Sequence, residues 1–150
     1  IFFFFLNAFR YQTSVYQMSD ISRFLLSHFS MESIRHSRQR NVAQLLEGLK
    51  NMPCIAEGFQ HGYSVAISPQ PTDILLALPI YTAKRDFLRK LLMEDKIYCA
   101  VHWPLGHPAA YAESRWIESH ILSLPIDQRY QKEEMQYLFD CLEACKKKMQ

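Results

Sequence analysis

The spacing of apolar residues changes its period along this chain, and that change limits the folds that the chain can adopt. In residues 19–50 the apolar side chains recur at steps of three and four, the period of a helix with one buried face. From residue 63 onward, short runs with the period of a half-buried strand alternate with further helical stretches. The sequence therefore predicts an α+β fold, in which a long helix precedes a small antiparallel or mixed sheet packed with helices.

Two helices are predicted in the first third of the chain. The first begins after Ser19, whose hydroxyl can cap it. The second is longer, begins at Ser30, and is expected to end between Gly48 and Pro53, because glycine and proline terminate helices. Residues 1–18 show no clean period, so we interpret them as a tail or a connecting segment.

The rest of the chain is predicted to alternate between strands and helices. Strands are expected at 63–67, 74–81, 97–103 and 121–126, and helices at 82–94, 109–117 and 135–145. Proline and glycine separate several of these stretches, for example in the SPQPTD and PLGHP segments. No internal repeat or long linker divides this part.

Composition excludes several functional classes. The net charge is only +2 and comes from 17 basic and 15 acidic residues spread along the chain, which does not favour nucleic acid or an anionic membrane as a partner. The opening IFFFFL is far shorter than the roughly 20 residues of a membrane helix, and it lacks the pattern of a secretory signal. The 4 cysteines form no disulfide framework. We therefore expect reduced thiols and a cytoplasmic protein.

No motif of a nucleotide-binding loop, a zinc protease or a serine hydrolase occurs in the sequence. The most site-like stretch combines polar and aromatic residues around a proline turn: His102, Trp103, His107, Tyr111 and His120. It is interpreted in three ways. It can be the aromatic end of a strand that closes a small core, one wall of a binding site, or a metal site made of the three histidines.

Arg129 is a further candidate, because it follows a predicted strand on a turn. An arginine there can hold a carboxylate or a phosphate with two parallel hydrogen bonds. The alternative is a structural ion pair with Asp127, and the sequence favours neither.

Two phrases resemble a known family. Residues 78–105, LPIYTAKRDFLRKLLMEDKIYCAVHWPL, resemble the C-terminal domain of DegT/StrS-type aminotransferases, and residues 121–138, ILSLPIDQRYQKEEMQYL, resemble the closing segment of the same domain. Residues 19–49 are similar to the long helix that joins the two domains of these enzymes, with Arg38, Arg40 and Asn41 at the family's R-R-x-N position. Val42 departs from the pattern, because the family usually has tyrosine there.

The resemblance implies a fold-type I enzyme in which a large domain binds pyridoxal phosphate and a small domain covers the site. The Schiff-base lysine and the aspartate that partners the pyridine nitrogen belong to the large domain. They have no counterpart here, because none of the chain's lysines that we considered stands in that context: Lys50, Lys84, Lys90, Lys96 and Lys132. The chain alone is therefore expected to bind no cofactor and to be inactive. Carried over by position, His102 and Trp103 are predicted to line the substrate pocket, and Arg129 to contact a carboxylate or a phosphate.

We therefore expect this chain, which begins at Ile1 without a methionine, to be cut from a longer parent. The parent would move an amino group from an amino acid, glutamate in our interpretation, to a keto-sugar or a similar carbonyl. Residues 1–18 would be a tail, 19–52 the connecting helix region and 53–150 the small domain. Expected partners are the large domain of the same parent, a small-molecule substrate, and a second copy in a homodimer or domain-swapped oligomer. The alternative is a noncatalytic homologue of the small domain that serves as an interaction or structural module.

Overall fold

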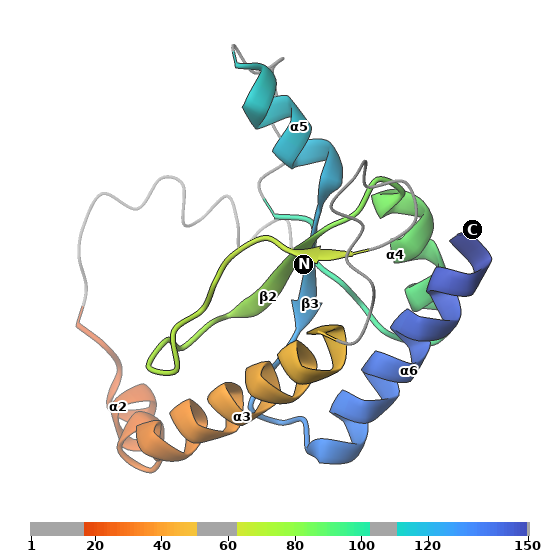
Figure 1. The fold of residues 1–150 in the computed structure, drawn as a ribbon. Coiled ribbons are helices and arrows are strands. Elements are labelled where there is room, and N and C mark those ends of the chain that lie inside the picture. The colour runs from red at the N-terminus through yellow and green to blue at the C-terminus, as the bar shows by residue number, and fades with distance from the viewer. Residues whose placement is uncertain (1–16, 51–62, 103–110, 150) are drawn as a thin grey trace. The chain divides into compact units, whose positions relative to one another are not determined.

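The computed structural model describes residues 17–50, 63–102 and 111–149, and within these ranges it contains five helices and a three-stranded sheet (Figure 1). In chain order the elements are α2 (Asp20–Ser27), α3 (Met31–Lys50), β1 (Ser64–Val65), β2 (Ala77–Tyr81), α4 (Arg85–Glu94), α5 (Ala112–His120), β3 (Ile121–Pro125) and α6 (Lys132–Met149). The predicted α+β class is confirmed. The chain divides into two compact units, residues 1–31 and 32–150. Across the described ranges, no helix has both the length and the apolar character needed to cross a membrane.

Helix α2 begins where the sequence predicts. The Ser19 hydroxyl accepts a hydrogen bond from the backbone N–H of Ser22 at 3.2 Å, which satisfies one of the free donors of the first turn. The helix has no buried residue, and its apolar side chains, among them Ile21, Phe24 and Leu25, are exposed. Its apolar face is therefore unpaired within the described chain.

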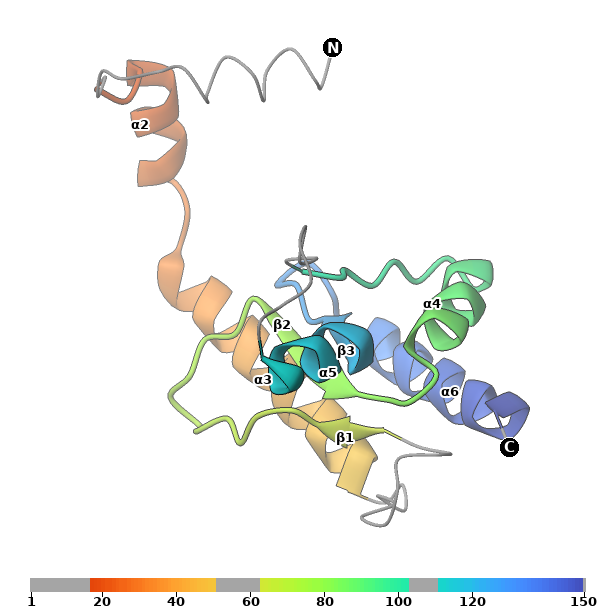
Figure 2. The ribbon, with the colours of Figure 1, turned by 90° about the horizontal axis from the view of Figure 1, so that it is seen from above.

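The strands are antiparallel in the order β1-β2-β3, and the chain from β1 to β2 can be followed in Figure 2. The register between β2 and β3 places Leu78 opposite Leu124 and Ile80 opposite Leu122, so these four side chains share one face of the sheet. All four are fully buried. This face is therefore the floor of the core.

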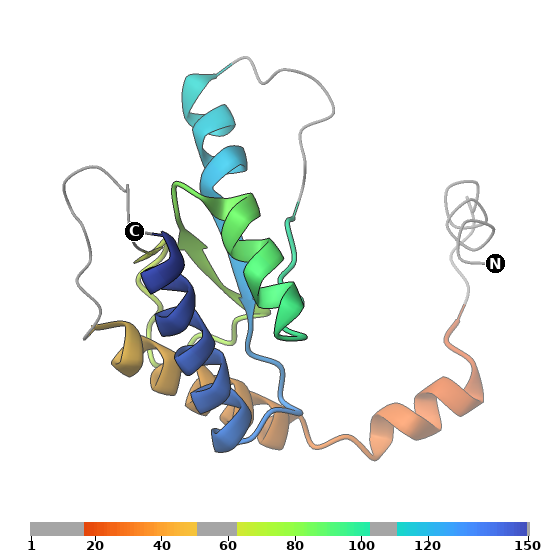
Figure 3. The ribbon, with the colours of Figure 1, turned by 90° about the vertical axis from the view of Figure 1, so that its right-hand side faces the viewer.

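Helices α3, α4 and α6 supply the other half of the core. Helices α4 and α6 pack side by side against the sheet, as Figure 3 shows. The fully buried side chains of the three helices include Leu45, Leu88, Leu92 and Leu142. At roughly 2 kcal/mol for each large apolar side chain removed from water, burial of this kind is the main stabilising contribution to the fold. The helical period read from the sequence identifies these positions.

The segment after α4 forms less sheet than predicted. Burial alternates as expected of a strand, since Ile97 and Cys99 are buried and Tyr98 between them is exposed. Within 97–102, however, the pairing is a single antiparallel bridge between Ala100 and Ser123 of β3. The carbonyl of Cys99 accepts a hydrogen bond from the Arg89 side chain at 3.3 Å instead of extending a ladder. The predicted strand is thus an extended segment beside β3.

Helix α3 ends at Lys50, within the predicted range from Gly48 to Pro53, so Gly48 lies inside the helix. Gly48 has a different role, which the structure makes clear. A Cβ atom built on it would lie 2.6 Å from Cδ2 of Phe139 on α6. The glycine therefore leaves room for the Phe139 ring against α3.

Helix α4 ends in a Schellman motif. The backbone N–H of Ile97 donates to the carbonyl of Leu92 at 2.8 Å, and the N–H of Lys96 donates to that of Met93 at 3.1 Å. This motif needs a left-handed residue after the cap, and Lys96 fills that position with a φ of 62°. A residue with a Cβ is destabilised by about 1 kcal/mol in this conformation, and glycine is therefore usual at this position.

We expect Lys96→Gly to stabilise the protein relative to Lys96→Ala. Both variants lose the lysine side chain, but only glycine relieves the left-handed strain, which amounts to about 1 kcal/mol before glycine's larger unfolded-state entropy is subtracted. Urea unfolding of the two variants measures the difference. Equal midpoints would show that the Cβ at this position costs nothing.

Candidate functional site

The polar face of α3 holds the turn that follows β3. Asn41 is 0% exposed, and its side-chain amide donates to the carbonyls of Asp127 at 2.9 Å and Tyr130 at 3.3 Å. Arg40 donates to the same Tyr130 carbonyl at 2.9 Å and to the side-chain oxygen of Asn41 at 3.2 Å. Buried carbonyls without such donors would cost the fold a desolvation penalty. Arg40 and Asn41 of the stretch RQRN therefore have a structural role in this chain.

Arg38 extends this contact to a second loop. Its Nε donates to the side-chain oxygen of Gln128 at 2.9 Å, and one Nη donates to the carbonyl of Leu75 at 2.8 Å. The other Nη lies 3.6 Å from Oδ2 of Asp127. One helix thus fixes both the loop that leads into β2 and the turn that leaves β3. We call the side chains of Arg38, Arg40 and Asn41 the α3 clamp.

Arg129, a predicted site residue, lies on the clamped turn. Its Nε donates to Oδ1 of Asp127 at 2.7 Å, and its backbone N–H donates to the same oxygen at 3.0 Å. The structural ion pair that the sequence left open is therefore present. The Arg129 side chain is nevertheless 78% exposed. The ion pair uses Nε, so the two Nη groups can still meet an anion from solvent.

The Asp127 carboxylate is held between two cations. Burial by itself raises its pKa, but hydrogen bonds from Arg129 and the positive charges of Arg129 and Arg38 outweigh burial and lower it. Asp127 is therefore ionised well below neutral pH. The same contact raises the pKa of Arg129.

This direction of shift predicts an acid-dependent loss of stability. Because the folded-state pKa of Asp127 is lowered, its contribution is present above the unfolded pKa of about 3.9 and is lost as the pH falls through the folded value. We expect the stability of Asp127→Asn to decline less than that of the unmodified chain between about pH 5 and pH 2. Urea midpoints across this range check the expectation, with Asp86→Asn, an exposed carboxylate on α4, as the control.

Two of the other predicted residues, His102 and His120, lie toward the opposite end of β3. His102 is exposed at the edge of the described segment, while Trp103 and His107 lie outside the described residues. The His120 ring stacks on Trp116 with centroids 4.5 Å apart. The backbone N–H of Thr82 donates to the His120 carbonyl at 3.0 Å, which joins the end of β2 to the start of β3.

The structure separates His102 from Arg129. The antiparallel bridge between Ala100 and Ser123 sets a register that places His102 opposite Ile121 and Tyr98 opposite Pro125. Arg129 follows Pro125, so the two candidates lie at opposite ends of a strand that is about 13 Å long. They do not line one compact pocket. The trio of histidines includes His107, which lies outside the described residues; within the described ranges no group of three metal-ligating side chains occurs.

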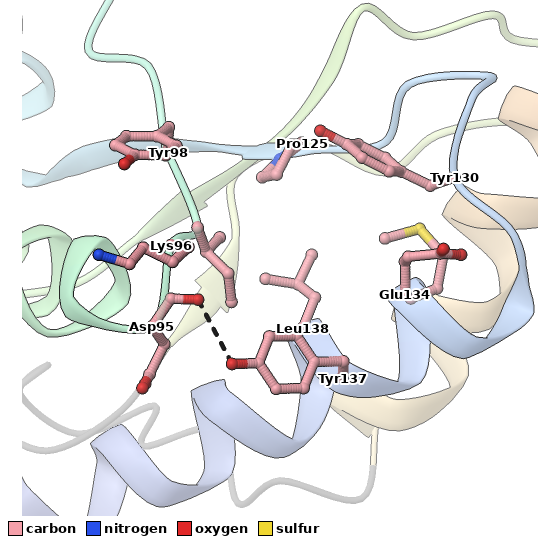
Figure 4. A pocket seen from close by; sticks show the side chains of 10 residues that line it. Asp95, Lys96, Tyr98, Pro125, Tyr130, Glu134, Tyr137 and Leu138 are labelled. Carbon is pink, nitrogen blue, oxygen red and sulfur yellow. Dashed lines mark hydrogen bonds between the residues drawn. The ribbon is translucent and has the colours of Figure 1, made fainter.

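A cavity of about 250 Å³ lies at the Arg129 end, and the sequence did not indicate it (Figure 4). The buried side chains of Ile97, Met135 and Leu138 form its floor. Its other lining residues are Asp95, Lys96, Tyr98, Pro125, Tyr130, Glu134 and Tyr137. These residues come from the end of α4, the end of β3 and the start of α6. Only the tertiary fold brings them together.

The cavity does not fit pyridoxal phosphate. That cofactor needs a lysine at its aldehyde, an acidic partner for its pyridine nitrogen and several donors for its phosphate. The one lysine of the lining, Lys96, is exposed, and Figure 4 shows it extending on the Tyr98 side, away from Tyr130. The lining contains no arginine that could bind the phosphate of the cofactor. The residues that line this cavity therefore do not fit the cofactor.

Several solved structures have a fold similar to that of this chain. Over 84% of its length the chain matches DesV of S. venezuelae, solved in complex with a ketimine intermediate, with a TM-score of 0.66 and 21% identity. It also matches a DegT DnrJ EryC1 StrS aminotransferase from Brucella abortus over 75%, with a TM-score of 0.59 and 19% identity. A third match is DesI in the presence of its TDP-sugar product, over 77%, with a TM-score of 0.60 and 18% identity.

These likenesses establish the fold. The chain spans about a third of each of the three solved proteins, 35%, 31% and 32% of their lengths. No protein-family model matches the sequence, and no curated protein matches it significantly. The fold predicted from the two sequence phrases, that of part of a DegT/StrS-type aminotransferase, is confirmed.

Proposed function

We propose that this chain is the C-terminal portion of a DegT/StrS-type aminotransferase that uses pyridoxal phosphate. The parent transfers an amino group from an amino acid, glutamate in this proposal, to a keto-sugar or a similar carbonyl. The observation that carries the proposal is the fold, which the chain shares with DesV over 84% of its length and with a DegT DnrJ EryC1 StrS aminotransferase over 75%. Residues 1–18, 19–52 and 53–150 are the tail, the connecting helix region and the small domain of this scheme.

Two further observations support a parent that is larger than this chain. The chain spans about a third of the three solved proteins that it matches, and the cavity at the end of β3 does not fit the cofactor. The exposed apolar face of α2 is a surface that a partner would cover. In this proposal the partners are the large domain of the same parent and a second copy of the protein.

His102 and Trp103 line the amino-acid or sugar pocket in this proposal. The exposure of His102 at the end of an extended segment supports such a role. Arg129 contacts a substrate carboxylate or phosphate only if the substrate is extended enough to reach the other end of β3. A nucleotide-linked sugar, the product bound to DesI, belongs to that chemical class.

The test is to produce the protein from its full reading frame and to record its absorption spectrum. We expect the absorption of pyridoxal phosphate bound to a lysine, and amino transfer from glutamate to a keto-sugar nucleotide. A reading frame without a lysine in a strand and turn upstream of residue 1 would contradict the proposal, as would a colourless protein after incubation with the cofactor.

A variant of that full-length protein tests the pocket residue. We expect His102→Ala to raise KM for the sugar acceptor by roughly tenfold, the effect of losing one hydrogen bond to the substrate. KM for the amino donor in the first half-reaction should change less. His36→Ala, an exposed histidine on α3, is the matched control. Equal kinetic constants for the two variants would remove His102 from the site.

The alternative function is a noncatalytic small domain that acts as an interaction or structural module. It is favoured by the chemistry of the cavity at the end of β3, whose lining does not fit the cofactor. Sedimentation of the 150-residue chain distinguishes the two. A monomer that unfolds reversibly favours the module, whereas concentration-dependent association, abolished by Phe24→Glu on the α2 face, favours a portion of a larger enzyme.

A further inference from the structure

We propose that the cavity at the end of β3 binds the methylated ammonium group of a small molecule, which contacts tyrosine rings and is attracted by two carboxylates. The cavity lies at the Tyr98 end of segment 97–102, whereas His102 lies at the other end. The inference is therefore separate from the substrate role proposed for His102. It rests on three features of the lining: its aromatic rings, its apolar floor and its negative charge.

Three tyrosines line the cavity. They are Tyr98 in segment 97–102, Tyr130 after β3 and Tyr137 on α6. Figure 4 shows Tyr98 and Tyr130 on either side of Pro125, and Tyr137 across the cavity from them. The face of an aromatic ring carries partial negative charge and attracts a cation that lies over it. Rings on several sides of one small space therefore favour an organic cation.

The floor of the cavity selects the kind of cation. It is formed by the buried, apolar side chains of Ile97, Met135 and Leu138. A primary ammonium is strongly hydrated and has three N–H donors that need acceptors, which such a floor does not offer. A trimethylammonium group has no N–H donor and meets the floor with methyl groups. We therefore expect a methylated ammonium to be preferred over a primary one.

The volume of the cavity limits the ligand to a small head group. Drug-sized ligands occupy pockets of roughly 300–1,000 Å³, and this cavity has about 250 Å³. A methylated ammonium with a short substituent is a ligand of that smaller class.

The charges of the lining favour a cation. Asp95 and Glu134 contribute two carboxylates and Lys96 contributes one amine, so the negative charges outnumber the positive one. Lys96 is exposed and extends on the Tyr98 side, away from Tyr130, as Figure 4 shows. The part of the cavity between Tyr130, Tyr137 and Glu134 is therefore where a cation meets least repulsion.

The two carboxylates keep their charge in the folded chain. Within the described ranges, the ion pairs involve acidic residues other than Asp95 and Glu134. Glu134 accepts a hydrogen bond from the backbone N–H of Gln131 at 2.8 Å, and Asp95 interacts with the Cys141 thiol. Both of these partners are neutral. A cation in the cavity would offset the negative charge that they leave.

The experiment titrates the 150-residue chain with choline and follows backbone amide NMR shifts. The uncharged isostere is the alcohol in which a carbon atom replaces the choline nitrogen, and ethanolamine is the primary amine. We expect choline to bind with a Kd of about 1 mM, the range for a ligand of this size, and to shift residues 95–98 and 134–138. The isostere and ethanolamine should each bind roughly fivefold more weakly.

Two variants change the charge of the lining in opposite directions. Glu134→Gln keeps an oxygen that can accept from Gln131 but removes the charge, so it should weaken choline about threefold and leave the isostere unchanged. Lys96→Gln removes the opposing charge and should tighten choline about twofold. Glu133→Gln, an exposed carboxylate on α6 that does not line the cavity, is the matched control and should change neither Kd.

A second pair of variants tests the aromatic contact. Tyr137 is 52% exposed, and its hydroxyl donates to the carbonyl of Asp95 at 3.3 Å. Tyr137→Leu keeps an apolar side chain but removes the ring, and it should weaken choline about threefold. Tyr137→Phe removes only the hydroxyl and should leave the choline Kd unchanged.

Vesicles of phosphatidylcholine distinguish a free amine from the same group in a lipid. The protein should not sediment with them, because Asp95 and Glu134 would repel the phosphate that follows the ammonium in the lipid head group. Sedimentation with the vesicles would overturn the assignment to a small soluble ligand.

Three results of the titrations would overturn the proposal. Shifts without a cluster at the cavity would show that choline has no site there. Equal affinities for choline and its isostere would show that the charge is not recognised. An unchanged choline Kd in Glu134→Gln or in Tyr137→Leu would remove the carboxylate or the ring from the site. None of these results depends on aminotransferase activity, so they leave the proposed function unaffected.

Discussion

Replacing Asn41 with leucine is expected to lower the free energy of unfolding by about 3 kcal/mol. The substitution keeps the volume of the side chain but removes the amide that donates to the carbonyls of Asp127 and Tyr130. It also removes the oxygen that accepts from Arg40. Because Asn41 is fully buried, water cannot replace these hydrogen bonds. Urea or thermal unfolding of the purified chain measures the loss.

Gln44 on the same helix provides the matched control. Its side-chain amide donates to the carbonyl of Lys132 at 2.9 Å, but this hydrogen bond is exposed to solvent. Gln44→Leu should therefore cost less than about 1 kcal/mol, since water can take over the carbonyl. If the two variants lost equal stability, the burial of the α3 clamp would not be the cause, and the structural interpretation of the clamp residues would fail.

The second large effect is expected at Gly48. A methyl group on this residue would lie 2.6 Å from the ring of Phe139, so α3 or α6 must move to accept Gly48→Ala. Such overpacking costs about 2 kcal/mol, which outweighs the helix propensity that alanine gains over glycine. Unfolding free energies of the single variant give the cost directly.

A double-mutant cycle assigns that cost to one contact. In a Phe139→Ala background the ring is absent, and Gly48→Ala should become neutral or slightly stabilising. The interaction energy between the two positions should then be about 2 kcal/mol. Additive effects would mean that the strain lies elsewhere, for example in the end of α3 itself.

Most of the fold could be predicted because local patterns decide it. The apolar period of residues 19–50 yields α2 and α3, and Ser19 is the cap that the sequence predicts. The alternation of burial through Ile97, Tyr98 and Cys99 is also as predicted. What a local pattern does not contain is pairing, so the strand expected at 97–103 is, in its described part, an extended segment with one bridge at Ala100.

The candidate site was predictable only in part, for the same physical reason. The sequence singles out His102 and Arg129 as polar residues at strand ends, but the distance between them depends on the direction in which segment 97–102 runs beside β3. The sequence does not predict whether Arg129 pairs with Asp127 across the turn, because each of the two side chains could also bind another partner. The cavity near Lys96 carries no sequence signal, since its lining comes from three separate elements.

The sequence by itself determined the fold class and the buried faces of α3, α4 and α6, because hydrophobic periodicity acts over neighbouring residues. It also carried the two phrases that identify the fold of an aminotransferase portion. The tertiary structure alone decided the role of the α3 clamp, whose partners lie about 90 residues away. The tertiary structure also decided which side chains lie at each end of β3. These contacts depend on strand register and on packing between elements that are far apart in the sequence.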